Sequence, residues 1–218
     1  MGNIEQRLAQ VHAVRTQLHN EGPTHLRPFA GDFERVALPR EDCDILRDAL
    51  IAEDAKVVIE VGLAYGSSAL AIGEALLRGG AAGISHVVID PYQGSSYANV
   101  GWEAICAAGL AASTMLITEP SSIALARLAS EGFTADTAFV DGSHRFHEVF
   151  VDLYYMRKLV RPGGLIILDD AAWPSVAAAL RYYDVNLGWR PEPIDGRLEA
   201  RRLPVEPVEP PFTDFTPF

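Results

Sequence analysis

The stretch KVVIEVGLAYGSS, residues 56–68, decides the fold of this 218-residue chain. Its first part, KVVIEVG, is short, β-branched and almost wholly apolar, which is typical of a parallel strand buried on both faces. A turn containing Gly62 and Gly66 follows it. The next segment, SSALAIGEALLRGG, predicts a helix that ends in a cation and a Gly-Gly pair. The stretch therefore predicts a strand, a glycine turn and a helix in direct succession.

The same alternation of strand and helix continues toward the C-terminus. Four more buried strands are expected, at HVVID (86–90), TMLIT (114–118), TAFVD (137–141) and GGLIILDD (163–170). Helices are expected between them, at GWEAICAAGLAA and from Phe146 to Val160, and another follows at SVAAALRYYDVN. This order calls for a doubly wound α/β fold with a parallel sheet and right-handed crossovers. The polar pair Asp195-Gly196 between two extended runs predicts an antiparallel hairpin at the end of the sheet.

The chain length fits a single domain, 1–218. The N-terminal part, 1–40, is expected to hold an amphipathic helix at 3–19, which packs on the domain or on a second subunit, and a connection able to cap an active site. A core at 41–203 opens with a helix at about 41–52. The tail, 204–218, is rich in Pro and acidic residues and is expected either to be disordered or to lay its Phe side chains on a neighbour.

Composition excludes several classes of partner. Hydrophobic residues make up 49% of the chain and charged ones 22%, as in an ordinary globular protein. The formal net charge of -11 and the pI near 4.9 argue against nucleic acid or an anionic membrane surface. No secretory signal or bilayer-spanning apolar run is visible. Because Cys43 and Cys106 lack metal-type spacing, they are expected to be reduced thiols in a cytoplasmic protein.

The glycine turn is a candidate ligand site, because open α/β sheets bind ligands beyond the carboxyl ends of their strands. Its G-x-x-x-G spacing is neither a dinucleotide fingerprint nor a P-loop. Asp90, at the end of the second strand, could hold a ribose diol, or could serve as a helix cap or a solvated carboxylate. Ser121 or Ser122, after the third strand, could cap a helix or contact an adenine edge.

Three carboxylates follow the fourth and fifth strands, namely Asp141, Asp169 and Asp170. Neighbouring parallel strands bring them to one edge, where like charges repel unless a cation compensates them. Oxygen ligands favour Mg²⁺, with Mn²⁺ or Ca²⁺ next. The alternative is that these residues cap a helix or bond to the backbone.

Two histidines, His144 and His147, begin the helix after the fourth strand. His144 is three residues beyond Asp141 and could accept the proton of a hydroxyl that attacks an electrophilic methyl group. His147 is expected to point outward. A zinc site is a competing interpretation, but no thiolates support it. A surface histidine without a role is the remaining alternative for His144.

The motifs EVGLAYGSS, VVIDPY, FVDGSHRFHEVFVDL and RPGGLIILDD together resemble class I S-adenosylmethionine-dependent methyltransferases over about residues 56–185. The pattern is most similar to the metal-dependent small-molecule O-methyltransferases, both the catechol O-methyltransferase-like and the macrolide sugar groups. The resemblance implies a Rossmann-like, mostly parallel seven-stranded sheet with helices on both faces. It also implies methyl transfer from S-adenosylmethionine to a hydroxyl of a small molecule, without nucleic acid or membrane as partner.

The resemblance assigns roles to individual residues. It implies that Gly62 and Gly66 approach the methionine part of the cofactor, that Asp90 holds the ribose and that Ser121 lies near adenine. His144 matches the general base of some members, whereas the catechol-type enzymes carry a lysine there and an asparagine at Asp170. The resemblance implies Mg²⁺ ligands at Asp141, Asp169 and Asp170. The full predicted cofactor-binding set is Glu60, Gly62, Gly66, Ser67, Asp90 and Ser121.

Other functions are weighed beside this one. A protein that binds S-adenosylmethionine without transferring its methyl group, and acts through its N-terminal helix and acidic tail, is the main alternative. The turn disfavours a nicotinamide-dependent oxidoreductase, and the absence of G-x-S-x-G disfavours a serine hydrolase. Four aromatic residues near the same edge are expected to be either substrate walls or ordinary packing: Tyr65, Tyr92, Trp102 and Trp173.

Overall fold

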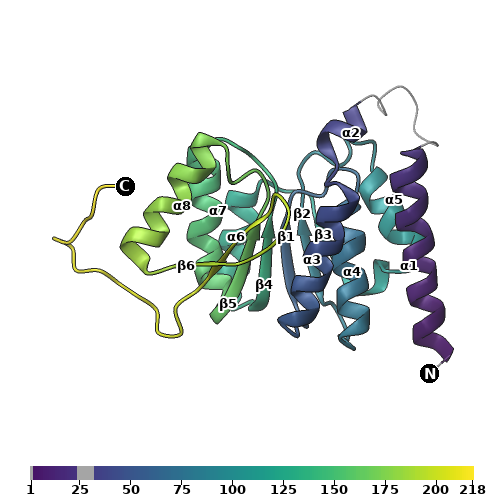
Figure 1. Cartoon of the computed structure of the whole chain (residues 1–218), viewed down its shortest axis with the longest axis horizontal. Helices are drawn as coiled ribbons and strands as arrows, with labels where there is room; N and C mark the ends of the chain where they lie inside the picture. Colours follow the sequence, from purple (N-terminus) through teal and green to yellow (C-terminus); the bar gives the residue numbers. More distant parts are fainter. Residues whose placement is uncertain (1, 24–31) are drawn as a thin grey trace.

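A seven-stranded sheet forms the centre of the protein (Figure 1). The structure is a computed structural model that describes residues 2–23 and 32–218. The strand order is β3-β2-β1-β4-β5-β7-β6. The strands are β1 (Val58–Val61), β2 (His86–Ile89), β3 (Thr114–Ile117), β4 (Ala135–Val140), β5 (Val160–Leu168), β6 (Arg190–Glu192) and β7 (Glu199–Arg202).

The register of the sheet brings the sequence motifs to one edge. Strand β1 pairs in parallel with both β2 and β4, so that Val61 lies opposite Ile89 on one side and Val140 on the other. Strand β4 pairs in parallel with β5, with Val140 opposite Leu168. The strand order reverses at β1, which is where open α/β sheets form their ligand crevice. Strands β6 and β7 are antiparallel, which confirms the predicted hairpin.

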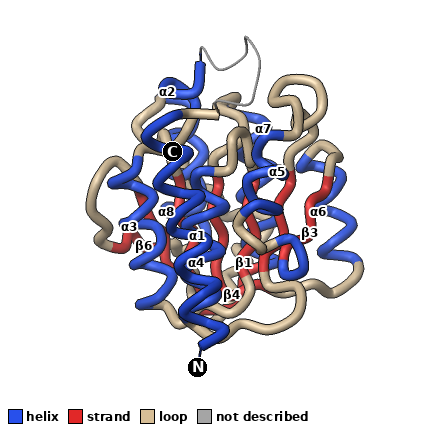
Figure 2. Tube along the Cα trace, turned by 90° about the vertical axis from the view of Figure 1, so that its right-hand side faces the viewer, coloured by secondary structure: helices blue, strands red, loops and turns tan. Residues whose placement is uncertain are grey.

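Helices cover both faces of the sheet, as Figures 1 and 2 show. One face carries α1, α3, α4 and α5, and the other carries α6, α7 and α8 (Figure 1). The predicted doubly wound fold is therefore confirmed. The helices are α1 (Gly2–Glu21), α2 (Phe33–Val36), α3 (Arg40–Ala52), α4 (Ser67–Arg78), α5 (Val100–Ala107), α6 (Ser121–Ser130), α7 (Phe146–Leu159) and α8 (Pro174–Leu187), with a 3-10 turn at Ala111–Ser113.

The apolar strands explain this layered arrangement. All four residues of β1 and of β2 are buried, as expected for strands covered on both faces. Ile59 and Ile89 belong to the core under α6, α7 and α8, whereas Val58 and Val88 pack toward the opposite helices. The alternation of side chains along each strand thus supplies both cores at once.

The N-terminal helix is fixed to the domain by charge as well as by apolar contact. Arg15 is buried and donates hydrogen bonds to Glu74 of α4 and, at 2.8 Å, to Asp44 of α3. A buried carboxylate needs such a partner, because desolvation of an unpaired charge is costly. The helix expected at 3–19 is confirmed and packs on α4.

Several details differ from the sequence-based prediction. The connection expected at 20–40 contains one helical turn, α2, while 24–31 lies outside the described residues. Val160 begins β5 directly after α7 instead of ending that helix, because strand pairing with Ala135 fixes it there. The end of the tail packs on α8, where Phe218 lies edge-on against Tyr182. Within residues 2–23 and 32–218, no helix is both long and apolar enough to cross a bilayer.

Candidate active site

The glycine turn after β1 is packed tightly against its own protein. A Cβ atom on Gly62 would lie 2.1 Å from the carbonyl oxygen of Asp141, and one on Gly66 would lie 3.1 Å from Gly101. Both glycines have positive φ, 95° and 87°, and Ala64 between them has a φ of 44°. Positive φ is strained for a residue with a side chain, and such strain concentrates at functional sites. Both glycines are therefore required by contacts with the end of β4 and the start of α5.

Asp90 binds the glycine turn through its carboxylate. Oδ2 accepts hydrogen bonds from the backbone N–H groups of Leu63 at 3.1 Å and Ala64 at 2.9 Å. Oδ1 accepts one from the backbone of Tyr92 at 2.7 Å. Only 3% of Asp90 is exposed. Asp90 thus ties the end of β2 to the turn after β1, at the place predicted for a ribose-binding acid.

Gln93 completes this arrangement and was missed by the sequence analysis. Its Nε2 donates to Oδ2 of Asp90 at 2.9 Å and to the carbonyl oxygen of Ala64 at 2.7 Å. The side chain is fully buried. Its position three residues beyond Asp90 was the available signal, but a glutamine in a polar loop has many possible partners. The loop that holds Tyr92 and Gln93 therefore closes over the glycine turn.

Glu60 lies fully buried below the turn. Its Oε1 accepts a hydrogen bond of 2.5 Å from the hydroxyl of Ser68, and its Oε2 lies 2.9 Å from Nε2 of His86. The pair joins β1, β2 and the start of α4. Glu60, assigned to the predicted cofactor set, thus has internal partners, and His86 is a second polar residue that sequence patterns did not single out.

The two serines of the predicted cofactor set lie in different surroundings. Ser67, at the start of α4, is buried, and its hydroxyl has no hydrogen-bond partner among the described residues. Ser121 begins α6, where its hydroxyl bonds to Asp152 of α7 and does not cap its own helix. Burial raises the pKa of Asp152 to about 7, and the bond from Ser121 opposes that rise. The capping role considered for Ser121 is therefore wrong.

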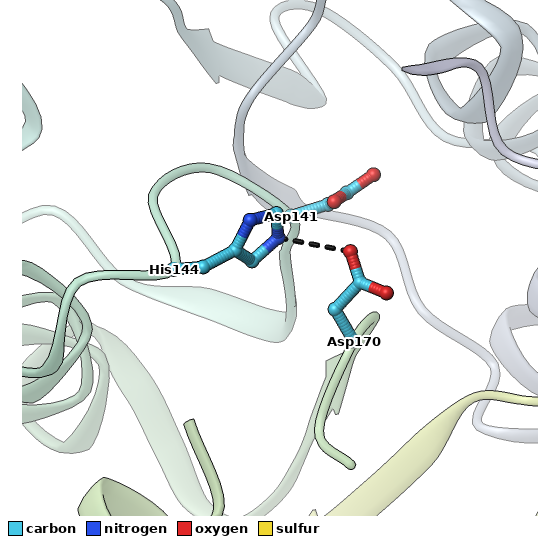
Figure 3. A group of neighbouring side chains, drawn as sticks. All are labelled: Asp141, His144 and Asp170. Atoms are coloured by element: carbon cyan, nitrogen blue, oxygen red, sulfur yellow. Dashed lines mark ion pairs between the residues drawn. The ribbon is translucent and has the colours of Figure 1, made fainter. Parts of the chain in front are cut away.

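Asp141, His144 and Asp170 converge at the ends of β4 and β5 (Figure 3). One ligand atom from each lies within 4.8 Å of the others. Nε2 of His144 lies 2.9 Å from Oδ2 of Asp170. Asp170 has a φ of 52°, in the left-handed region that aspartate tolerates better than most residues. This geometry brings together two of the three predicted metal ligands and the predicted base.

Asp169 lies beside the group but has a different partner. Its Oδ2 accepts a hydrogen bond from Nη2 of Arg197, which follows the Asp195-Gly196 turn. Its Oδ1 is buried and has no hydrogen-bond partner among residues 2–23 and 32–218. Asp169, the third predicted metal ligand, is thus outside the group of Asp141, His144 and Asp170 and faces Arg197 instead. Arg197 was missed, since the Asp-Gly turn predicts a hairpin but not where the residue after it reaches.

Electrostatics reflect this crowding of acids. Burial, together with the negative charges of Asp169 and Asp170, raises the pKa of Asp141 well above its usual value. Burial also raises the pKa of Asp169, while the bond from the backbone of Asp170 and the charge of Arg197 act in the opposite direction. The site is therefore short of positive charge.

The aromatic candidates divide into packing residues and exposed ones. Tyr65 is buried and packs edge-on against Tyr97, and Trp102 lies partly buried in the same core. Tyr92 and Trp173 are 58% and 51% exposed. Trp173 stacks on the imidazole of His144, with ring centroids 4.7 Å apart. His147 points outward, as predicted, with a side chain that is 75% exposed.

Comparison with protein families identifies the chain. A family model described as a methyltransferase domain matches residues 59–171, from β1 to just beyond β5, which is more than half of the 218 residues. The chain therefore belongs to this methyltransferase family. The resemblance to class I methyltransferases and the prediction of a methyltransferase are confirmed. A comparison with curated proteins finds no match.

Solved structures share the fold at low sequence identity. The cofactor-bound protein Rv0187 from MTB has a TM-score of 0.65 at 20% identity, with 92% of this chain and 90% of that chain covered. An O-methyltransferase from Bacillus cereus in complex with SAH has a TM-score of 0.63 at 17% identity, with 90% of each chain covered. The O-methyltransferase TomG from Streptomyces achromogenes, in complex with SAM, has a TM-score of 0.60 at 16% identity, with 90% and 89% covered. These likenesses establish a common fold.

Proposed function

We propose that this protein transfers a methyl group from S-adenosylmethionine to a hydroxyl of a small molecule, assisted by a divalent cation. One observation carries the proposal: the glycine turn lies at the same edge of the sheet as Asp141, Asp169 and Asp170. These three carboxylates, called the acidic group below, are short of positive charge. Gly62 packs directly on the backbone of Asp141, so the turn and the acids are neighbours. Family membership supports methyl transfer, and the acids support a cation that positions the acceptor oxygen.

The proposed cofactor site is the turn together with the start of α4. Ser67 offers a buried hydroxyl without a partner among the described residues, and the first N–H groups of a helix favour polar or anionic atoms. Asp90 would hold the ribose by exchanging its bonds to the turn for bonds to the ribose hydroxyls. The relatives from Bacillus cereus and Streptomyces achromogenes, solved with SAH and SAM, support this choice of cofactor.

The residues of the acidic group fit a divalent cation. Asp141 and Asp170, whose ligand atoms lie within 4.8 Å of each other, would supply oxygen ligands. The free Oδ1 of Asp169, which lies outside that cluster of ligand atoms, would supply a third if its carboxylate moved toward them. We propose Mg²⁺ as the ion, since hard oxygen ligands predominate. Such an ion, when bound, lowers the pKa of a substrate hydroxyl and fixes its approach.

His144 is the proposed base. Because Nε2 faces Asp170, the other ring nitrogen, Nδ1, would accept the hydroxyl proton, while Asp170 would orient the ring and stabilise the imidazolium that forms. Trp173, stacked on the same ring, restricts its rotation. If His144 were instead a cation ligand together with Asp141 and Asp170, replacement of His144 would weaken cation binding.

The remaining proposals concern the chain as a whole. We propose that 1–218 acts as a single domain on a small hydroxylated molecule, and that the outer face of α1 provides any contact between copies. Cys43 and Cys106 are free, and Cys43 is buried, which supports a reducing cytoplasmic setting.

Calorimetric titration tests the cofactor first. S-adenosylhomocysteine should bind, NAD should not, and Gly62→Val should abolish binding because the new side chain would collide with Asp141. Methyl transfer to a panel of small hydroxylated compounds should then depend on added Mg²⁺ and be lost in His144→Ala with cofactor affinity kept. Cofactor binding without transfer to any acceptor would favour a binding protein. Binding of NAD in place of S-adenosylhomocysteine would overturn the proposal.

A further inference from the structure

The β6–β7 hairpin places a guanidinium at the acidic group. Gly196 has a φ of 70°, and a Cβ on it would lie 2.3 Å from Oδ1 of Asp42 in α3. The backbone N–H of Arg197 donates to that same oxygen at 3.2 Å. The end of the hairpin is therefore seated on α3, and the backbone of Arg197 has a defined position.

The side chain of Arg197 links two buried carboxylates. Its Nη2 donates to Oδ2 of Asp169, and its Nε lies 3.6 Å from Oδ2 of Asp42. The Arg197 side chain is 44% exposed, whereas those of Asp169 and Asp42 are 2% and 10% exposed. The guanidinium thus reaches inward from the surface and has two alternative anionic partners.

Arg197 supplies positive charge where the acidic group lacks it. Within residues 2–23 and 32–218, it is the one Arg or Lys that forms an ion pair with Asp141, Asp169 or Asp170. An unpaired buried carboxylate is costly, so Arg197 stabilises Asp169 when no other cation is present. The same charge repels any second cation that approaches the group.

We propose that Arg197 is a resident counter-ion that competes with the divalent cation and thereby sets the affinity of the acidic group for metal. The inference rests on the proposed metal site. A cation held by Asp141 and Asp170 would draw the free Oδ1 of Asp169 toward itself and compete with the guanidinium for that carboxylate. Arg197 then shifts toward Asp42, which takes over as its main partner. Asp42 is the residue that makes this exchange possible.

Two substitutions with opposite expected effects test the proposal. Mn²⁺ binding to the full chain is measured at neutral pH by the electron paramagnetic resonance signal of the free ion. Arg197→Gln removes the competing charge, and Mn²⁺ should bind at least about tenfold more tightly. Asp42→Asn weakens the alternative partner of Arg197, and Mn²⁺ should bind about threefold or more weakly.

Two further variants are matched controls. Arg197→Lys keeps the charge and should bind Mn²⁺ within about threefold of the wild type. Arg202→Gln removes a charge from the same hairpin, but Arg202 pairs with Glu53 and Glu192, which do not belong to the acidic group. It should change the affinity less than about twofold. Equal or weaker binding in Arg197→Gln would overturn the proposal while leaving the metal site intact.

A thermal measurement covers the case in which Arg197→Gln folds poorly. Without metal, this variant leaves the buried charge of Asp169 unpaired, so its Tm should fall below that of the wild type. Saturating Mn²⁺ should raise the Tm of the variant more than it raises that of the wild type. If the variant binds Mn²⁺ and the wild type does not, Arg197 excludes the metal fully, and the metal-assisted mechanism proposed above fails instead. If neither protein responds to Mn²⁺, both ideas fail.

Discussion

The candidate site has two halves, the glycine turn with Asp90 and the acidic group, and they differ in how their negative charges are compensated. On the glycine-turn side, Asp90 accepts four hydrogen bonds from the protein itself, three of them from backbone N–H groups. On the acidic side, Asp169 has one oxygen without a partner among the described residues, and the charges of Asp169 and Asp170 add to burial in raising the pKa of Asp141. The carboxylate of the first half is fully hydrogen-bonded within the protein, and the second half is short of positive charge.

This difference indicates how each half would meet its ligand. Cofactor entry exchanges existing hydrogen bonds for new ones, so the net gain is modest and the loop of Tyr92 and Gln93 has to move. Cation entry relieves repulsion already present in the protein, so the gain is large even though water must be removed. We therefore expect substitutions in the first half to affect folding and cofactor together. Substitution of Asp141 in the second half should affect metal binding while leaving the fold stable.

The largest expected effect is on the glycine-turn side. Asp90→Ala removes the acceptor for the N–H groups of Leu63, Ala64 and Tyr92, and each donor left buried costs about 1 to 3 kcal/mol. The free energy of unfolding in urea should fall by roughly 3 kcal/mol or more, and S-adenosylhomocysteine affinity should drop at least about 100-fold. Asp90→Asn keeps an acceptor oxygen and should lose less of both. An Asp90→Ala protein of unchanged stability would contradict the structural role.

A smaller effect, limited to the affinity for metal, is expected on the acidic side. Asp141→Asn should weaken Mn²⁺ binding by roughly 30-fold, because one of few charged ligands becomes neutral. Without metal it should unfold at the same or a higher Tm, since the pKa of Asp141 is raised by burial and by its acidic neighbours. S-adenosylhomocysteine affinity should stay nearly constant.

Asp136, at the opposite end of β4, is a matched control for this substitution. It accepts hydrogen bonds from the backbone of Lys56 and Val57 and pairs with Arg161. Asp136→Asn should therefore lower the Tm without changing Mn²⁺ affinity. If Asp141→Asn instead abolished cofactor binding, the division of roles between the two halves would be wrong.

The smallest expected effect concerns Asp152, a buried carboxylic acid that belongs to neither half of the candidate site. Burial raises the pKa of Asp152 to about 7, and Ser121 supplies one bond to it. Because the folded pKa lies above the unfolded one, the contribution of Asp152 to stability is present at pH below about 4 and is lost as pH rises through 7. The Tm of Asp152→Asn minus that of the wild type should therefore increase by several degrees between pH 5 and pH 8. Calorimetric scans at several pH values would show it, and a constant difference would contradict the assignment.

Local patterns in the sequence were sufficient for most of the fold. Buried strands such as β1 and β2 are short β-branched runs, and the glycines that end α4 mark its limit in the chain. The Asp195-Gly196 pair predicted the hairpin for the same reason, because a turn residue acts on its own backbone. Val160 was assigned to the wrong element, since a strand that starts directly after a helix leaves no loop residues as a signal.

The partners within the site could not be predicted in the same way. Asp141 and Asp170 follow from parallel strands, whose ends meet at one edge. The bond between Arg197 and Asp169 depends on how the hairpin seats on α3, through Asp42, which is 155 residues away in the chain. The closure by Gln93 depends on the path of a loop. Such contacts are set by tertiary packing, to which propensity and periodicity do not respond.

The left-handed backbone conformation of Asp170 limits which residues can replace it during evolution. At a φ of 52°, glycine, asparagine and aspartate are the residues accommodated with least strain. A longer acid such as glutamate would bear the conformational penalty and displace its oxygen from Nε2 of His144. Divergence at this position is therefore confined to a choice between a charged and a neutral short side chain. Over evolutionary time, a single-base change from aspartate to asparagine is the accessible way to alter the charge here without rebuilding the loop.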